Sequence, residues 1–430
     1  MIFSVVIYAR ITKILEKGTL TMSHDEAIMR QQTADSRQQT ADSHEHSQKL
    51  RVLYVTNMDG TGGGASFSLC ALMLDLKKRY NVEPVFFTRY DSEFTDLCRK
   101  NGIEVITQNY YAWAGENNLK SRIKLTAKKF LNRLLFVKRR ILKRLDGRHF
   151  DIIHTNSSVT DMGDFISQHY SIPHVWHIRE SGCFVYHYPE EYVRTLHARA
   201  AANIMISHAN YDFYVNQRKI CPPENTRVIY NGVKEPAEYE KRAPNPQHIH
   251  FCMTGAAWNS SKNQMMAVKA CEKLKSLTSS FTLHLVGSSD NSYGENIKRF
   301  VHAHGLDDYV KFWGYHSGVD EILKDMDVGL MLSEREGFGR VTVEYMLHYM
   351  PVIGVNSGAT PEIVLDGETG FLCTLNDTDT LAELMHRFIT NPELIHTMGS
   401  KGRQRAVTHF SLERNTDEIY ALYQEILSRH

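Results

Sequence analysis

The sequence has little of what marks a disulfide-bonded, zinc-binding, membrane-spanning or nucleic-acid-binding protein. Its seven cysteines are scattered and never occur as C-x-x-C, which argues against a disulfide framework or a zinc site and fits reduced thiols in a cytoplasmic protein. No apolar run approaches the roughly 20 residues of a membrane-spanning helix. The formal net charge of +1 argues against a general nucleic-acid binder. The chain therefore reads as an ordinary globular protein.

The length predicts two domains behind a polar leader. At 430 residues the chain is long enough for two domains of roughly 100–200 residues each. The apolar start, residues 1–9, is too short for a membrane span and lacks the leading basic region of a signal peptide. Residues 22–48 are polar and contain RQQTADS twice in tandem. We expect residues 1–50 to be a disordered leader, with Met22 as an alternative start.

Apolar runs and helical stretches alternate from Arg51 to the C-terminus. This alternation predicts parallel sheets with helices on both faces, and so an α/β protein with two Rossmann-like domains facing across a cleft. The expected strands lie at 51–55, 84–88, 103–106, 151–155, 173–178, 203–207, 249–254, 281–287, 310–313, 328–332 and 352–355. The predicted parts are an N-terminal domain at 51–233, a linker rich in proline and charge at 234–248, a C-terminal domain at 249–410, and a C-terminal helix at 411–430 that crosses back to the first domain.

Two glutamates, Glu336 and Glu344, flank a glycine turn between a predicted strand and a predicted helix. The apolar run 328–332 reads as a buried strand, and Val341–Met350 reads as a helix that ends before a proline. A helix that begins after such a turn directs unpaired N–H groups and partial positive charge at a phosphate. The segment therefore predicts a pocket for a polyhydroxylated, phosphorylated ligand.

This segment resembles the E-x7-E motif of the retaining glycosyltransferases of the GT4 family, which have the GT-B architecture. The resemblance runs from Arg51 to the C-terminus and is most specific after Gly255. It implies that Glu344 binds ribose hydroxyls and that Glu336 contacts and positions the donor sugar. It further implies that the backbone N–H groups of the turn hold the donor diphosphate; the turn consists of Gly337, Phe338, Gly339 and Arg340.

Two further loops fit the same resemblance. A glycine-rich loop that includes Gly63 and Gly64 follows the first strand, in the place where GT4 enzymes approach the donor phosphates and the acceptor. A tight turn without a ligand is the alternative interpretation. After the first strand of the second half, Gly255 opens a segment in which Lys262 matches a family lysine that contacts the diphosphate. Ala256 stands where the family has an arginine, so half of that cationic clamp is missing.

A histidine at the end of a first-domain strand completes the predicted site. The resemblance implies that such a histidine points into the cleft near the transferred sugar, and His177, after the run HVWHI, is our prediction. His154, at the end of another predicted strand, is the competing candidate. Arg179 is predicted to bind a phosphate of the acceptor.

The segment 119–149 carries twelve Lys and Arg residues and a single acidic residue, Asp146. Apolar residues recur in it at intervals of three to four, which predicts a basic amphipathic helix for an anionic membrane surface. A core helix with a solvated basic side is the alternative, and an RNA contact lacks the aromatic stacking residues it would need. The segment resembles the basic, apolar patch on the first domain of membrane-associated GT-B enzymes, which meets a lipid-linked acceptor.

The sequence thus predicts a metal-independent glycosyltransferase, a hexosyl- or N-acetylhexosaminyltransferase, that is cytoplasmic and peripheral on the inner face of the cell membrane. The expected partners are a nucleotide-sugar, a UDP-sugar first, and a glycan or lipid-linked acceptor of cell-surface polysaccharide or glycolipid synthesis; no cofactor and no nucleic acid are expected. Asp325-Met326-Asp327 offers a D-x-D metal site, but its place at a helix end favours a structural Asp. A GT-B-like epimerase, an inactive glycan-binding relative and a membrane- or RNA-binding protein remain as alternatives.

Overall fold

The computed structural model describes residues 49–57, 64–110, 115–116, 136–180, 186–187, 190–236, 245–316 and 318–430. The predicted leader, apart from its last two residues, lies outside the described residues. So do Gly63, the first half of the predicted basic helix and the middle of the predicted linker.

The first half of the described chain forms a seven-stranded sheet in the order β3-β2-β1-β5-β6-β8-β9, with every neighbouring pair parallel. Its strands are β1 (Leu50–Val55), β2 (Val82–Thr88), β3 (Glu104–Thr107), β5 (Ile152–Thr155), β6 (His174–Ile178), β8 (Ala202–Met205) and β9 (Thr226–Val228). The helices are α3 (Gly64–Tyr80), α4 (Glu93–Lys100), α6 (Val137–Leu145), α7 (Met162–Tyr170), α8 (Glu190–Ala198) and α9 (His208–Tyr211), followed by a π-helix η1 (Asp212–Gln217) and a 3₁₀ turn η2 (Pro223–Asn225). Two-residue strands β4 (Gly115–Glu116) and β7 (Tyr186–His187) pair antiparallel.

Helices cover both faces of this sheet. Because successive side chains of a strand point to opposite faces, each strand contributes side chains to two cores. In β1, Val52 and Tyr54 belong to the core formed with α3, α4 and the C-terminal helix. Leu53 and Val55 belong to the core formed with α6 and α7. A strand covered on both sides reads as a continuous apolar run, which is why the sequence indicates it so clearly.

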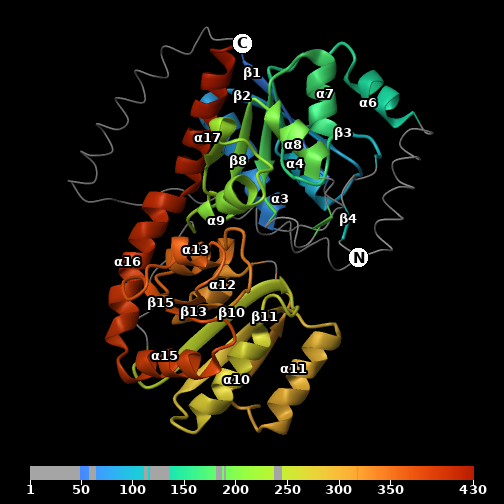
Figure 1. Cartoon of the computed structure of the whole chain (residues 1–430). Helices are drawn as coiled ribbons and strands as arrows, with labels where there is room; N and C mark the ends of the chain where they lie inside the picture. Colours follow the sequence, from blue (N-terminus) through green and yellow to red (C-terminus); the bar gives the residue numbers. More distant parts are fainter. Residues whose placement is uncertain are drawn as a thin grey trace, which may run out of the picture.

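The second half repeats the plan with a six-stranded parallel sheet among the described residues, in the order β12-β11-β10-β13-β14-β15. Its strands are β10 (Ile249–Ala257), β11 (Phe281–Ser288), β12 (Val310–Gly314), β13 (Val328–Met331), β14 (Val352–Val355) and β15 (Gly370–Cys373). Its helices are α10 (Gln264–Lys275), α11 (Ser292–Ala303), α12 (Asp320–Leu323), α13 (Arg340–Leu347), α14 (Thr360–Ile363), α15 (Thr378–Thr390) and α16 (Glu393–Phe410). The two domains lie one above the other in Figure 1.

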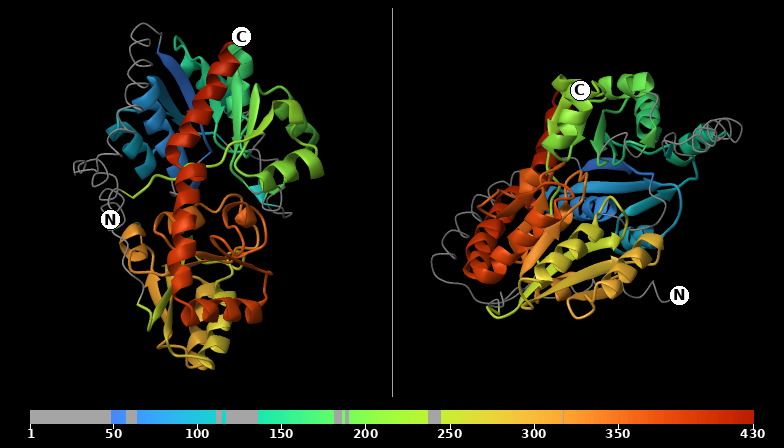
Figure 2. Two further views of the ribbon diagram at one scale, coloured as in Figure 1. Left: turned by 90° about the vertical axis from the view of Figure 1, so that its left-hand side faces the viewer. Right: turned by 60° about the horizontal axis from the view of Figure 1, so that its bottom comes forward.

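The last helix, α17 (Leu412–Leu427), returns to the first domain (Figure 2). The helical path breaks at Ser411, whose backbone is extended and whose hydroxyl accepts a hydrogen bond from Arg414 N at 3.4 Å. Beyond the break, Ile419, Leu422 and Ile426 of α17 join the core of the first sheet. The two halves are therefore joined by the chain near Val233 and again by the junction of α16 and α17, where Val233 N donates to Phe410 O.

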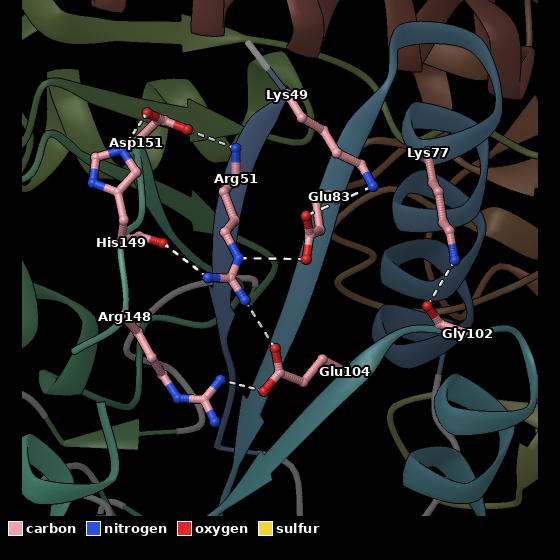
Figure 3. A network of polar contacts seen from close by, with 9 residues as sticks. All are labelled: Lys49, Arg51, Lys77, Glu83, Gly102, Glu104, Arg148, His149 and Asp151. Carbon is pink, nitrogen blue, oxygen red and sulfur yellow. Dashed lines mark hydrogen bonds and ion pairs between the residues drawn. The ribbon is translucent and has the colours of Figure 1, made fainter. Parts of the chain in front are cut away.

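Charged side chains gather at the amino-terminal edge of the first sheet (Figure 3). Arg51 at the start of β1 bonds Glu104 of β3 at 3.0 Å and contacts Glu83 of β2 at 3.4 Å, and its backbone N–H donates to Asp151 at 2.6 Å. Pairs of this half-exposed kind contribute about 0–1 kcal/mol each. These pairs link the amino-terminal ends of neighbouring strands, at the edge of the sheet opposite to the carboxyl ends. We therefore assign them a structural role.

The predicted alternation and α/β class are confirmed, with differences in detail. Each expected strand corresponds to an observed one, whereas β9, β15 and the two-residue strands β4 and β7 were not predicted. The helix expected at Val341–Met350 begins one residue earlier and ends at Leu347, because Tyr349 has a left-handed backbone with φ of 57°. In the described part of the predicted basic helix, the apolar side chains of α6 are core residues, as the alternative interpretation expected: Val137, Ile141 and Leu145.

Candidate active site

In each sheet the chain first adds strands on one side of its first strand and then adds the later strands on the other side. We call the place between these two groups of strands the reversal point. The order places β1 beside β5 in the first sheet and β10 beside β13 in the second, although the chain visits other strands between them. Open α/β sheets bind ligands at such points, outside the carboxyl ends of the strands. Lys262 follows β10 and Glu336 follows β13, while His177 and Arg179 lie at the end of β6, two strands from β1. The predicted site residues therefore gather at the carboxyl edges of the two sheets.

Lys262 and Glu336 form an ion pair with 2.7 Å between Nζ and Oε2. The loop of Lys262 is shaped by Asn259, whose backbone and side-chain oxygens both accept from Lys262 N at 3.1 Å. The loop of Glu336 is tied to the same turn, because Glu334 N donates to Ser261 O at 2.9 Å. The lysine is 39% exposed and the glutamate 18%, so a ligand can reach both charges. This pair lies on the reversal point of the second sheet.

The glycine turn leads from Glu336 into α13. Gly339 precedes the helix with φ of +83°, a conformation that favours glycine. Phe338 is buried, with its ring centroid 6.2 Å from that of Tyr230 and 5.8 Å from that of Phe410. The ring anchors the turn, and α13 begins at Arg340 with N–H groups that have no acceptor within the helix. The structure thus forms the strand, turn and helix that the sequence predicted, with Gly337 and Gly339 in the turn.

Arg340 connects the second predicted glutamate with the first domain. Its Nε donates to Glu344 Oε1 at 2.9 Å, one helical turn along α13. Its Nη1 lies 3.4 Å from the hydroxyl of Ser68, in α3. The guanidinium therefore bridges the two domains beside the N-terminus of α13, a side-chain arrangement that the sequence did not predict.

A second loop supports Glu336 from behind. Ala359 N donates to Glu336 O at 3.0 Å, and the Ser357 hydroxyl bonds Glu334 O. Gly358 lies between them with φ of +56°, and a Cβ there would stand 2.6 Å from Glu336 O. Only glycine fits this close approach, so Gly358 helps to fix the position of the Glu336 carboxylate.

On the first domain, Arg179 is held by neutral partners. Its Nε donates to Asn156 Oδ1 at 2.8 Å, and its Nη1 bonds Asn231 Oδ1. In the described part of the chain no carboxylate lies within ion-pair distance of it. Burial lowers the pKa of Arg179 to about 9, while the Glu180 carboxylate raises it and the nearby Arg340 guanidinium lowers it. A partly buried cation without an ion-pair partner favours the binding of an anion.

His177 and His154, the two competing histidines, are neighbours. Both are fully buried, and His154 Nε2 lies 3.2 Å from His177 Nδ1. His154 Nδ1 lies 2.6 Å from the hydroxyl of Tyr423. Burial, with the positive charge of Arg179, holds the pKa of both imidazoles well below its usual range. His177 is thus the histidine next to Arg179, and His154 lies behind it.

The remaining predicted residues are placed as follows. Gly64 is the first residue of α3, and Gly255 lies near the end of β10 with open space where a Cβ would be. Ala256 is exposed next to it. Asp327 accepts a hydrogen bond from His250 N at 2.8 Å, a structural role. Within the described ranges no three His, Cys, Asp or Glu side chains gather as metal ligands, and no helix has the length and apolar character of a membrane span.

Two surface hollows in the described structure lie away from these residues. One, of about 700 Å³, is between α9, β9 and α17, and the other, of about 560 Å³, is beside α8 and η1. Neither contains a predicted site residue, and neither holds the convergence of charges seen around Lys262. We therefore assign the site from the side chains and not from the size of a hollow.

Glu362 is a further residue that the sequence did not single out. From α14 of the second domain it accepts from His208 N at 2.7 Å, Ala209 N at 2.6 Å and Tyr230 Oη at 3.0 Å. These groups belong to α9 and to the strand end that precedes the linker. No local signal marks this contact, because it depends on how the two domains meet.

The chain matches two family descriptions in succession. Residues 63–235 match "Glycosyltransferase Family 4", and residues 238–405 match "Glycosyl transferases group 1". The N-acetyl-alpha-D-glucosaminyl L-malate synthase of Bacillus anthracis is 34% identical over 122 residues, which is 28% of this chain and 32% of that protein. The human alpha-1,3/1,6-mannosyltransferase ALG2 is 33% identical over 179 residues, 39% of this chain and 43% of that protein. The chain thus matches less than half of the length of either relative.

Solved structures share the fold over most of the chain. HepE of Anabaena, in complex with UDP and glucose, superposes with a TM-score of 0.71 at 21% identity, covering 87% of this chain and 100% of that one. A glycosyltransferase of Rickettsia africae superposes with a TM-score of 0.73 at 19% identity, covering 89% of this chain and 100% of that one. These neighbours have the same two-domain architecture.

Proposed function

We propose that this chain, which belongs to the GT4 glycosyltransferases with the GT-B fold, transfers a sugar from a nucleotide-sugar to a glycan or lipid-linked acceptor with retention of configuration. The observation that carries the proposal is the ion pair of Lys262 and Glu336 at the reversal point of the second sheet, beside the N-terminus of α13. A cation, a carboxylate and a helix N-terminus together suit a sugar diphosphate.

We propose one orientation of the donor on these groups. Lys262 and the N–H groups of Phe338, Gly339 and Arg340 bind the diphosphate, so that positive charge lies where negative charge develops as the sugar departs. Glu336 accepts hydrogen bonds from hydroxyls of the sugar, and Glu344 from the ribose. In the free protein the Glu336 carboxylate pairs with the Lys262 ammonium. When the donor binds, its diphosphate pairs with Lys262 instead, and the Glu336 carboxylate accepts hydrogen bonds from the sugar.

The side chain of Arg340 supplies the second cation that Ala256 lacks. It lies at the start of α13 and is near enough to Arg179 to lower the pKa of that residue, so two guanidinium groups of different domains face one region. Glu344 partly balances the charge of Arg340, whereas Arg179 has no carboxylate within ion-pair distance among the described residues, so a bound anion would reduce the repulsion between the two guanidinium groups. We assign Arg340 to the donor diphosphate and Arg179 to an acidic group of the acceptor.

The reaction needs one bond to form as another breaks. The bond between the sugar's anomeric carbon and the phosphate oxygen breaks, and the acceptor oxygen bonds to that carbon on the same face. The departing phosphate takes the proton of the acceptor hydroxyl, so neither a protein nucleophile nor a metal is required. Lys262 and α13 stabilise the phosphate charge throughout. Gly64, the first residue of α3, has no Cβ and would let the backbone of the first domain approach the phosphates closely.

We propose UDP as the nucleotide, supported by the fold shared with proteins whose structures contain UDP. We also propose that the enzyme works in the cytoplasm against the inner face of the membrane. The support is the basic side of α6: Lys138, Arg139, Arg140, Lys143 and Arg144. Because the apolar side of α6 is core, this contact would be electrostatic and would weaken with salt.

A thermal-shift screen across UDP-, GDP- and ADP-sugars tests the proposal. A ligand that binds the native state raises its stability by mass action, so a UDP-sugar should raise the melting temperature. The Glu336→Ala variant should lose the sugar-dependent part of that shift and keep the shift given by UDP alone. If no nucleotide-sugar shifts the melting temperature and none is consumed with any acceptor, the proposal is wrong.

A further inference from the structure

A row of buried polar side chains leads from the C-terminal helix to His177. The hydroxyls of Tyr54 in β1 and Tyr423 in α17 lie 3.2 Å apart. Tyr423 Oη lies 2.6 Å from His154 Nδ1, and His154 Nε2 lies 3.2 Å from His177 Nδ1. At the far end, Arg179 Nη2 lies 3.5 Å from the same His177 Nδ1. All four ring side chains of the row are fully buried.

The direction of these hydrogen bonds follows from their two ends. A guanidinium only donates, so His177 Nδ1, which faces Arg179, must accept. His154 Nε2 then carries a proton and donates to His177 Nδ1. Since a neutral imidazole has one N–H, His154 Nδ1 accepts, and Tyr423 must donate to it. Tyr54 in turn donates to the oxygen of Tyr423, so each proton between Tyr54 and His177 Nδ1 has an acceptor.

The opposite direction fails at both ends. His177 Nδ1 would then donate its proton to His154 Nε2, and Arg179 Nη2, 3.5 Å from the same nitrogen, would face an N–H group in place of an acceptor. At the other end Tyr423 would donate to Tyr54, whose own hydroxyl proton would have no acceptor among the described residues. The first direction leaves one N–H without an acceptor in the described part of the chain, His177 Nε2–H at the end of the row next to Arg179. The second leaves the Tyr54 hydroxyl proton without an acceptor inside the core and also sets two donors against each other, so the first direction is the more stable one.

The row leaves His177 with its proton on Nε2. That atom is buried and has no hydrogen-bond partner in the part of the chain described. Because burial and Arg179 keep both imidazoles neutral, neither changes the pattern by taking up a second proton near pH 7. An N–H of this kind donates to an oxygen and cannot accept a proton from a hydroxyl.

We propose that Tyr423 and His154 are positioning residues that hold His177 as the Nε2–H tautomer, so that His177 donates a hydrogen bond to a substrate hydroxyl and does not act as a base. This inference rests on the proposed glycosyl transfer and adds the role of the C-terminal helix. It leaves the departing phosphate as the proton acceptor and makes the packing of α17 on the first domain a condition for activity.

Nitrogen-15 NMR of the full-length protein, labelled at histidine, tests the tautomer directly. His154 and His177 should each show one neutral tautomer, protonated at Nε2. In Tyr423→Phe, His154 loses its donor and the ring signals should change to those of mixed tautomers. Tyr420→Phe is the matched control, because this tyrosine of α17 stacks on Tyr80, 4.0 Å between centroids, outside the row. A protonated Nδ1 on His177 in the unchanged protein would overturn the proposal.

Kinetics distinguish a donor from a base. A glutamine amide can place an N–H near the position of His177 Nε2, whereas alanine cannot. His177→Gln should therefore keep at least ten times the kcat of His177→Ala, and Tyr423→Phe should lower kcat several-fold with an unchanged KM for the donor. Equal loss in His177→Gln and His177→Ala would sink the donor role. A nucleotide-sugar shift in the melting temperature of both variants would show that the donor site itself is intact, which separates this failure from a failure of the proposed function.

Discussion

The ammonium of Lys262 lies 2.7 Å from the carboxylate of Glu336, although 74 residues separate them in the sequence. The contact exists because β10 and β13 are neighbours in the sheet and their carboxyl ends open into adjacent loops. A half-exposed pair of this kind contributes at most about 1 kcal/mol to stability. Its place at the reversal point of the sheet indicates a role in binding.

Replacing either partner should remove activity and leave the fold intact. We expect Lys262→Ala and Glu336→Ala to abolish detectable transfer, since loss of one charge-stabilising donor alone costs about 10²–10³ in kcat. The free energy of unfolding should change by less than about 1 kcal/mol, measured by denaturant titration. Lys298→Ala, which breaks an exposed pair with Glu295 on α11, is the control and should leave transfer unchanged. Near-normal rates in either site variant would refute the assignment.

Ala256 stands where the family has an arginine, and we propose that Arg340 supplies the positive charge in its place. Moving that charge from position 340 to position 256 tests this. If Arg340 serves the diphosphate, Arg340→Leu should weaken UDP binding about ten-fold, or about 1.4 kcal/mol. Adding Ala256→Arg to that variant should restore most of the affinity, because a cation returns to the end of β10. Isothermal titration of UDP measures both. If Arg340→Leu binds UDP as tightly as the unchanged protein, Arg340 has no part in the donor site.

The local pattern of the chain was enough to predict the α/β fold and the sequence neighbourhood of the site. Glu336, the glycine turn and α13 follow one another within a dozen residues, so spacing alone places them together. Tyr423 and His154 are 269 residues apart, and Arg340 and Ser68 are 272 apart. Such contacts depend on how α17 and the domains pack, and no periodicity in the sequence encodes that. The same holds for Glu362.

Gly358 should be needed for more than its backbone angle. A Cβ at Gly358 would meet Glu336 O at 2.6 Å, whereas at Gly367, with φ of +75°, it would meet nothing within 4 Å. Gly367→Ala should therefore lose only the roughly 1–2 kcal/mol of a left-handed alanine. Gly358→Ala should lose more and should also displace Glu336. Denaturant titration gives the first difference, and the kcat of transfer gives the second; equal effects in the two variants would contradict the close approach.

Glu362 should hold the two domains together. Its carboxylate accepts two backbone N–H groups at the start of α9, and hydrogen bonds to a charged group contribute about 1.5–3 kcal/mol each. In Glu362→Gln one of these bonds is lost and the other loses its charged acceptor, so the amides of His208 and Ala209 should both exchange with solvent faster, one of them at least ten-fold. Hydrogen exchange followed by NMR or mass spectrometry measures this. Glu383→Gln, at an exposed position on α15, is the control. Unchanged exchange at His208 would show that Glu362 does not restrain α9.

Buried histidines should make the fold sensitive to mild acid. Burial lowers the pKa of His174 to about 3, of His197 to about 4 and of His284 to about 3, against an unfolded value near 6.5. Below pH 6.5 the unfolded chain takes up protons that the folded chain does not. The stability that these residues contribute is therefore complete above pH 6.5 and is lost as the pH falls towards 4.

Each such histidine adds up to about 1.4 kcal/mol per pH unit, so the three together should give a slope near 4 kcal/mol per unit at about pH 5.5. Denaturant titrations between pH 5 and pH 7 measure the slope. His154 and His177, whose pKa is also held well below 6.5, add to the slope in the same direction. His197→Gln should therefore reduce the measured slope by about 1.4 kcal/mol per pH unit, whatever it does to the stability at pH 7, because one titrating group is removed from the unfolded chain. A free energy of unfolding that stays constant from pH 7 to pH 5 would mean that these histidines titrate in the folded protein as they do in the unfolded one.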